Sequence, residues 1–233
     1  NIVKEDSEFV YVKIKKELYH SDTNIKQPSL FKIRDIETFK EMIEDEDFSI
    51  KNCYGRTFLH YIDKPELLNY FLSLNEEKKW IDLIDLDNFN SSYLHSAPNL
   101  ECFQILFTKM AEIEPITTET FLFGKDLFNK SGYENFTTLL SLKVQNKEDF
   151  ISTFNNPEIL NTVSKVLRAL KKVSPSECDF FESQFSTNKS IVSYLKDNKE
   201  LEQQINKMFL MVRLDNNLSH KEINTDKIKK LKI

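Results

Sequence analysis

The sequence holds few residues that could do chemistry, and its cysteines and histidines are the first candidates. A cysteine partnered by a histidine is the arrangement of an activated nucleophile, and both residue types bind zinc. Cys53, Cys102 and Cys178 are odd in number and widely spaced, and no two of them form a Cys-x-x-Cys pair. We therefore interpret them as small apolar side chains in a reducing cytosol. We assign His60 and His95 to structural hydrogen bonds at helix starts, because an imidazole can join backbone groups of adjacent turns.

Three aspartates close together suggest a calcium-binding loop. Asp82, Asp85 and Asp87 supply carboxylates, but the stretch lacks the glycine at the sixth position and the glutamate at the twelfth that such a loop needs. We therefore expect no metal, no cofactor and no catalytic residue, and the chain is not predicted to be an enzyme. The alternative is the non-catalytic part of an enzyme or of a secreted effector, with its chemistry in the insertion at 108–128 or outside this chain.

The elements that must position these residues repeat along the chain. Residues 52–60 read Asn-Cys-Tyr-Gly-Arg-Thr-Phe-Leu-His, and residues 87–95 read Asp-Asn-Phe-Asn-Ser-Ser-Tyr-Leu-His. In both copies a glutamate, Glu66 or Glu101, follows seven residues after the leucine and begins an apolar run. Self-similarity at this period indicates a supersecondary unit that cannot bury its own apolar face and stacks on its neighbours.

These units resemble the ankyrin repeat, which has a polar turn, a Thr-Pro-Leu-His start to a first helix, and a second, more apolar helix. Gly55, Thr57, Leu59 and His60 match this pattern directly. The threonine is suited to cap the first helix, because its hydroxyl accepts a hydrogen bond from an unpaired amide.

The copies also depart from the ankyrin pattern. Phe58 and Tyr93 replace the proline, and Asn90 stands where glycine is usual. Asparagine tolerates the left-handed conformation that the turn requires, so the turn is expected in both copies. Both copies are about three residues short between the histidine and the glutamate, which implies a clipped first helix.

The resemblance implies an all-α helical solenoid of three to four divergent repeats over 28–155. Helix pairs are expected at 28–48, 57–78, 92–112 and 134–155, with Leu30, Leu59, Leu94 and Phe136 in the core. Residues 108–128 are expected to form an irregular insertion. A third turn is predicted at 129–133, because Asn-Lys-Ser-Gly-Tyr echoes Asn-Cys-Tyr-Gly-Arg, and a full-length first helix is expected after it.

The flanking regions differ from the repeats. Residues 1–27 are expected to form an N-terminal arm, with a β-prone stretch at 9–14. In 156–233, apolar residues recur at intervals of three and four residues, which predicts amphipathic helices. These helices form either a cap on the stack or a separate bundle. Ser174-Pro175-Ser176-Glu177 reads as a capping box with proline at the first helical position. Residues 227–233 form a basic amphipathic tail.

Composition narrows the classes of function. The 233 residues carry a net charge of -5, which opposes a phosphate-binding face, so nucleic acid is not an expected partner. No stretch approaches the roughly 20 apolar residues of a membrane span. The expected location is the cytoplasm, with the nucleus as the alternative.

Ankyrin-like stacks generally bind another protein through their turn tips, called fingers, and their concave face, so the resemblance implies a protein–protein interaction module, a scaffold or an adaptor. Rigidly held, exposed aromatic and arginine side chains are suited to anchor a partner. The alternative is that Tyr54 and Phe89 fold back and pack finger on finger. The predicted partner-binding residues are Tyr54, Arg56, Asp87, Phe89, Asn90 and Tyr133.

Overall fold

The computed structural model describes residues 29–44 and 46–230. The regular secondary structure of this part is helical. For Ser29 and for 215–230 the backbone alone is described. No strand occurs in this part, and the prediction of an all-α fold is confirmed. The expected N-terminal arm and residues 231–233 of the basic tail lie outside the described residues. In chain order the helices are η1 (Ser29–Lys32), α2 (Ile36–Met42), η2 (Phe58–Tyr61), α3 (Pro65–Lys78), α4 (Tyr93–Ser96), α5 (Leu100–Ile113), α6 (Pro115–Phe123), α7 (Gly132–Lys143), α8 (Lys147–Phe154), α9 (Pro157–Val173), α10 (Pro175–Thr187), α11 (Lys189–Lys196) and α12 (Lys199–Lys230).

Up to Phe154, each of the four ranges expected for a helix pair holds two helices. We call the first helix of each pair the leading helix. The leading helices η1, η2 and α4 have 4 residues each, so the clipped first helix predicted for the two clear copies is confirmed. The leading helix α7 has 12 residues and is full length, as expected. Pro65 opens α3 at its first position, where the missing N–H of proline costs no hydrogen bond.

One apolar core runs through the described residues from η1 to α12. Its N-terminal end is aromatic, with the ring centroid of Phe39 4.9 Å from that of Phe48. Trp80 stacks on Phe71, with 5.5 Å between the ring centroids, and thus packs against the helices. Large rings bury much apolar area, which stabilises a stack of short helices. The predicted core positions are all buried, namely Leu30, Leu59, Leu94 and Phe136.

The segment expected to be an irregular insertion at 108–128 is largely helical, so that prediction is wrong. Helix α5 continues to Ile113, and α6 begins two residues later at Pro115. Proline at the first position lets a new helix start directly after the old one. The β-branched Thr118 is tolerated within α6 because it is buried and its hydroxyl donates to the carbonyl of Glu114 at 2.8 Å.

The helices after Asn156 pack on one another and on the preceding units. Helix α9 buries its apolar stripe, Ile159, Val163, Val166, Leu167 and Leu170, and lies against α5, α8, α10 and α12. The predicted helix start at Pro175 is confirmed. The capping box is not formed, because the side chain of Ser174 makes no capping hydrogen bond.

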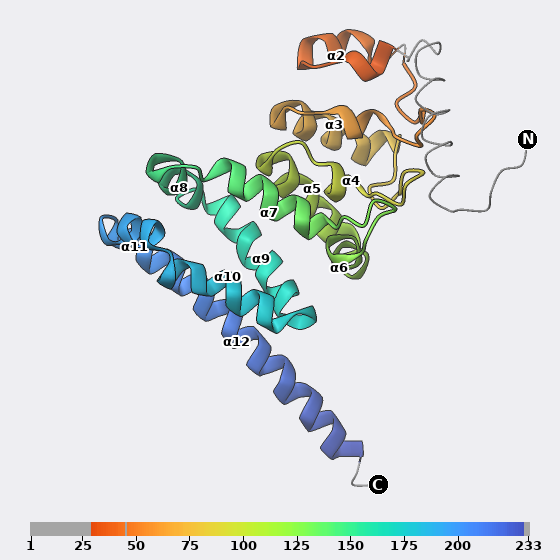
Figure 1. Cartoon of the computed structure of the whole chain (residues 1–233). Coiled ribbons are helices and arrows are strands. Elements are labelled where there is room, and N and C mark those ends of the chain that lie inside the picture. Colours follow the sequence, from red (N-terminus) through yellow and green to blue (C-terminus); the bar gives the residue numbers. More distant parts are fainter. Residues whose placement is uncertain (1–28, 45, 231–233) are drawn as a thin grey trace, which may run out of the picture.

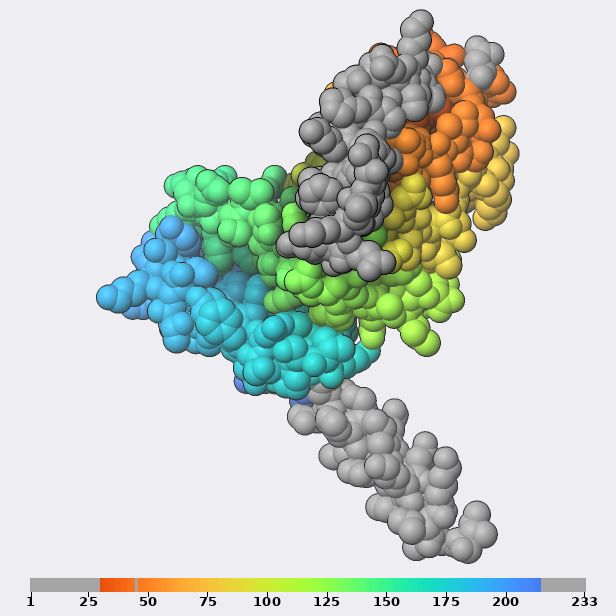
Figure 2. Space-filling view, turned by 45° about the vertical axis from the view of Figure 1, so that its right-hand side comes forward, coloured from red at the N-terminus to blue at the C-terminus, as the bar shows by residue number. Residues whose placement is uncertain are grey.

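The arrangement of the layers is visible in two views. Helices α2, α3 and α5 follow one another through the upper part of the molecule, while α9–α12 lie below them and α12 extends away from the body (Figure 1). Figure 2 shows α9–α11 in cyan to blue at the lower left, against the green region of α7 and α8.

Candidate functional site

Three five-residue turns with the same backbone geometry precede the leading helices of successive units. In the turn 87–91, the N–H of Asp87 donates to the carbonyl of Ser91 at 3.0 Å, and the N–H of Asn90 donates back to the carbonyl of Asp87 at 3.1 Å. The turns 52–56 and 126–130 contain the same two bonds. The fourth residue of each turn has a positive φ: 74° at Gly55, 58° at Asn90 and 60° at Asn129.

The third turn therefore lies at 126–130, and the prediction of 129–133 is wrong by three residues. The left-handed residue is Asn129, whereas Gly132 lies inside the first turn of α7. Gly132 is needed for a different reason. A Cβ atom there would lie 3.0 Å from the carbonyl oxygen of Phe121 and 3.1 Å from Cβ of Leu94. The glycine permits close helix packing rather than a turn.

Tyr133 is consequently not at a turn tip, so its predicted place is corrected. It lies in the first turn of α7, half-buried, with its ring 5.9 Å from that of Phe123. Burial raises the pKa of its phenol to about 12. The residue at the tip of the third turn is Phe128, which sequence reasoning missed. The sequence contains a pattern that could have located this turn, because Phe-Asn-Lys-Ser at 128–131 matches Phe-Asn-Ser-Ser at 89–92.

Main-chain hydrogen bonds join each turn to the next. The N–H of Asn88 donates to the carbonyl of Tyr54, and the N–H of Leu127 donates to the carbonyl of Phe89, both at 2.9 Å. We call the three turns, residues 52–56, 87–91 and 126–130, the turn edge. Backbone atoms therefore satisfy each other between neighbouring turns.

Side chains add a second set of links along the turn edge. Arg56 Nε donates to Asp87 Oδ2 at 2.9 Å, and the hydroxyl of Ser91 donates to Asp126 Oδ2 at 2.8 Å. The side chain of Asp87 has 0% exposure, and its other oxygen accepts from the N–H groups of Phe89 and Ser91. Two predicted partner-binding residues, Arg56 and Asp87, are therefore brought together as a structural pair.

Asp126 holds the third turn in the same way that Asp87 holds the second. Its Oδ1 accepts from the N–H groups of Phe128 and Lys130 at 2.8 and 2.9 Å. Burial acts to raise the pKa of this carboxyl, but the hydrogen bonds from Lys130 and Ser91 outweigh burial and lower it.

Aromatic rings form a row across the three tips. The ring centroids of Tyr54 and Phe89 are 6.0 Å apart, and those of Phe89 and Phe128 are 5.1 Å apart. Tyr54 and Phe89 therefore pack on each other, as in the alternative that the sequence left open, yet both remain half-exposed. Phe128 is 38% exposed and Leu127 is 56% exposed, and Asn90 in the second turn is also exposed.

His60 and His95 lie at the starts of helices, where the sequence analysis assigned them to structural hydrogen bonds. The three leading helices η2, α4 and α7 are each opened by a capping box, formed by Thr57 with His60, by Ser92 with His95 and by Ser131 with Glu134. Nδ1 of each histidine accepts from the N–H of its cap residue at 3.2 Å. Their assignment to structural hydrogen bonding is confirmed.

The two histidines differ in the surroundings of their second ring nitrogen, Nε2. Nε2 of His95 lies 3.2 Å from the carbonyl oxygen of Gly124, whereas Nε2 of His60 is buried without a hydrogen-bond partner. Burial lowers the pKa of His60 to about 4, with the nearby Arg56 acting in the same direction. The imidazole of His60 is therefore neutral at pH 7.

The buried cysteines are poorly suited to nucleophilic chemistry. Burial raises the pKa of the Cys102 thiol to about 12, and it also raises the pKa of Cys178. A thiol attacks as the thiolate, which a raised pKa disfavours. Within residues 29–44 and 46–214, no group of three His, Cys, Asp or Glu side chains is arranged to hold a metal ion. The same residues contain no helix long and apolar enough to cross a bilayer.

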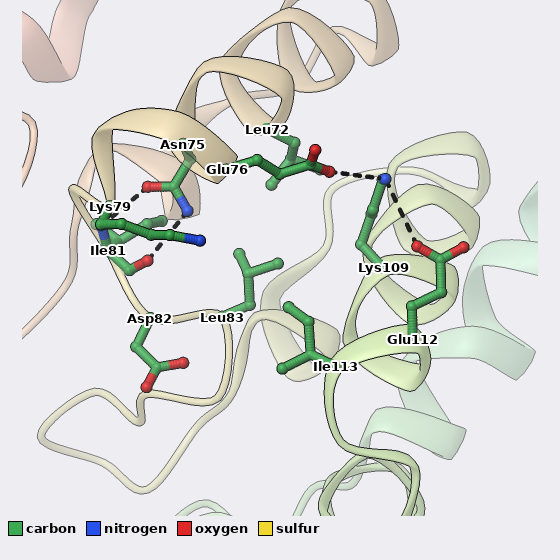
Figure 3. Close-up of a pocket in the computed structure, with 10 residues that line it drawn as sticks. All are labelled: Leu72, Asn75, Glu76, Lys79, Ile81, Asp82, Leu83, Lys109, Glu112 and Ile113. Atoms are coloured by element: carbon green, nitrogen blue, oxygen red, sulfur yellow. Dashed lines mark hydrogen bonds and ion pairs between the residues drawn. The ribbon is translucent and has the colours of Figure 1, made fainter.

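A second surface feature is a cleft of about 520 Å³ between the last turns of α3 and α5, which we call the α3–α5 cleft. Four apolar residues line it, Leu72, Ile81, Leu83 and Ile113 (Figure 3). On the α5 side, Lys109 Nζ lies 2.9 Å from Glu76 Oε1 and 3.5 Å from Glu112 Oε2. The hydrogen bond with Lys109 lowers the pKa of Glu76.

Asn75 fixes the opposite wall of the cleft. Its amide donates to the carbonyl of Ile81 at 3.0 Å and accepts from the N–H of the same residue at 2.9 Å. This wall carries Lys79 and Asp82, which Figure 3 shows on the side away from Lys109 and Glu112. Lys79 has the left-handed conformation, with φ 55°, and its N–H caps α3 on the carbonyl of Asn75.

Comparisons with models of protein families, with curated proteins and with solved structures return no match.

Proposed function

We propose that this chain is a protein–protein interaction module. In this proposal, 28–155 form a helical solenoid of divergent ankyrin-like repeats, 156–233 cap it, and a partner protein binds along the turn edge and the adjoining concave face. The module acts as a scaffold or adaptor in the cytoplasm and carries no catalytic group.

The observation that carries the proposal is the construction of the turn edge. Three turns are joined by main-chain hydrogen bonds of 2.9 Å and present a continuous row of half-exposed and exposed rings. A rigid row loses little conformational entropy when a partner binds, and aromatic side chains are the residues that dominate protein interfaces. Burial supports the same proposal for two of the three cysteines, since it raises the pKa values of the Cys102 and Cys178 thiols.

The test must separate binding from folding, because Phe89 and Arg56 also hold the turns together. Leu127 is the better probe, since its side chain is 56% exposed and its structural contribution to the turn edge is its backbone N–H. Leu127→Asp keeps that N–H and places a charge on the row. Leu142→Asp is the matched control, because Leu142 is 62% exposed on α7 and makes no part of the turn edge.

The experiment is affinity capture from an extract of the source cells, quantified by mass spectrometry, with the two variants and the unmodified chain. We expect Leu127→Asp to reduce capture of specific partners about tenfold, because it places a charge beside the row of rings. Leu142→Asp should retain them, and both variants should unfold at the temperature of the unmodified chain. Equal capture by all three proteins would refute binding at the turn edge.

A further inference from the structure

The turn edge and the residues just before its turns carry exposed apolar side chains. Ile50 and Leu86 precede the first and second turns and are exposed, as is Leu127 in the third. Lys51 Nζ lies 2.7 Å from Asp85 Oδ2, so the segments that lead into the first two turns lie side by side. In the described residues up to 112, large apolar side chains are exposed only on these two segments.

The spacing of the row of rings matches the pitch of a helix. Neighbouring ring centroids of Tyr54, Phe89 and Phe128 are 6.0 and 5.1 Å apart, and one turn of an α-helix advances about 5.4 Å. Side chains three or four residues apart on a helix follow one another at this interval. An amphipathic helix along the row can therefore place one apolar side chain on each tip and remove the rings from water.

The N-terminal segment of this chain, which lies outside the described residues, has the required pattern. Val10, Ile14 and Leu18 recur at intervals of four residues, which places them on one face of a helix. Residues 9–14 are β-prone as well. Of the two conformations, the helix is the one whose spacing fits the row of rings.

The described part of the chain begins beside the first turn. The helix η1, which starts at Ser29, lies against η2, with the ring of Phe31 5.2 Å from that of Tyr61. The hydroxyl of Tyr61 accepts from Nδ2 of Asn52, the first residue of that turn, at 2.6 Å. The ten residues between Leu18 and Ser29 reach roughly 35 Å when extended, which is longer than the row of three tips.

Charge sets the direction in which the segment runs. Of the two lysines at the third turn, Lys125 pairs with Glu134 at 2.5 Å, whereas Lys130 is exposed and makes no ion pair within the described residues. The stretch 5–8, Glu-Asp-Ser-Glu, carries three carboxylates. A segment that leaves the first turn and follows the row brings this acidic stretch to the third turn, where Lys130 lies.

We propose that residues 5–18 bind along the turn edge of their own chain. Leu18 lies at the first tip, Ile14 at the second and Val10 at the third. The acidic stretch 5–8 then reaches Lys130. The inference rests on the proposed function, because a partner protein must displace this segment to bind the turn edge. The segment therefore holds the site closed, and the partner presents an amphipathic helix of the same kind.

The test is limited proteolysis of the full chain with trypsin, which cleaves after the segment's Lys13, Lys15 and Lys16. A synthetic peptide of residues 1–27 gives the cleavage rate of the unprotected segment. A tethered segment has an effective concentration of about 1 mM, so a dissociation constant of about 0.1 mM protects it about tenfold. We expect this protection in the unmodified chain and in Leu142→Asp, and its loss in Leu127→Asp.

Lys130→Gln tests the direction of the segment. It removes the cation that the acidic stretch reaches, so cleavage should accelerate about twofold to fivefold, the range for exposed charge pairs. Lys125→Gln is the matched control, because Lys125 is paired with Glu134, and it should leave the rate unchanged. Equal acceleration by both variants would overturn the proposed placement.

Partner capture separates the inference from the proposed function. Ile14→Asn should free the turn edge and raise capture about threefold to tenfold, whereas Thr23→Asn, outside 5–18, should leave capture unchanged. Cleavage of the unmodified chain at the rate of the free peptide, or protection that persists in Leu127→Asp, would overturn the inference and leave the proposed function standing. Protection that is lost in Leu127→Asp, with no partner captured by any variant, would support the segment's contact and overturn the proposed function.

Discussion

His60 shows how one half-buried residue links stability to pH. Its Nδ1 accepts from the N–H of Thr57, so the ring proton is on Nε2, which has no acceptor. Burial lowers the pKa of His60 to about 4 from its ordinary 6.5. Between these values the unfolded chain binds the proton more readily than the folded chain. The free energy of unfolding therefore falls as pH drops from about 6.5 to about 4.

We expect this one histidine to cost about 3 kcal/mol of stability at pH 4 relative to pH 7. His60→Gln removes the titrating group and keeps an acceptor at the third position of the capping box, where glutamine is a regular choice. The measurement is urea unfolding from pH 4 to 7. The loss of stability on acidification should be smaller in His60→Gln than in the unmodified chain, and equal losses would show that His60 is not the group responsible.

At the scale of the element, the turns depend on glycine and asparagine for different reasons. Gly55 and Asn90 share a positive φ, but Gly55 also lies against the next turn. A Cβ atom at Gly55 would lie 2.5 Å from Oδ1 and 2.9 Å from the backbone nitrogen of Asn88. That nitrogen makes the hydrogen bond to Tyr54 that joins the first two turns.

Gly55→Ala should therefore destabilise the protein by about 1–3 kcal/mol, because it combines a left-handed alanine with a contact that forces the turns apart. The matched change is Asn90→Gly, which keeps the turn conformation and should alter stability by less than about 1 kcal/mol. Equilibrium unfolding in urea measures both. If Gly55→Ala were as mild as Asn90→Gly, close approach of the two turns would not contribute to the stack.

At the scale of the whole molecule, the core of the described residues has no break between the helices up to α8 and the helices that follow. Leu167 of α9 is fully buried in the same apolar cluster that includes Phe71. Trp80, which stacks on Phe71, is the single tryptophan of the chain and lies at the other end of the core. Its fluorescence reports on the N-terminal units, while far-ultraviolet circular dichroism reports on all helices.

Leu167→Ala should cost about 2–5 kcal/mol, the range for truncating a buried leucine. We expect the tryptophan and dichroism transitions to coincide and to shift together in this variant, because a shared core unfolds cooperatively. Leu142→Ala, on the exposed side of α7, should shift neither. A tryptophan transition that stays in place while the dichroism splits would show that the C-terminal helices are a separate folding unit.

Local patterns in the sequence determined most of the secondary structure. The repeated turn and histidine predicted two of the three turns and their one-turn helices, because a left-handed residue and a capping box act within a few residues. The apolar stripe of α9 was readable for the same reason, since spacing of three and four places residues on one face.

Tertiary structure decided the features that local sequence patterns left ambiguous. Asn129 and Gly132 both permit a left-handed turn, and the choice between them rests on the hydrogen bond from Leu127 to Phe89 and on the packing of Gly132 against Leu94. The α3–α5 cleft was likewise unreadable, because Glu76 and Lys109 lie far apart in the chain and meet only when the two helices pack. Such contacts depend on how separate elements come together, and a pattern confined to one element carries no information about that.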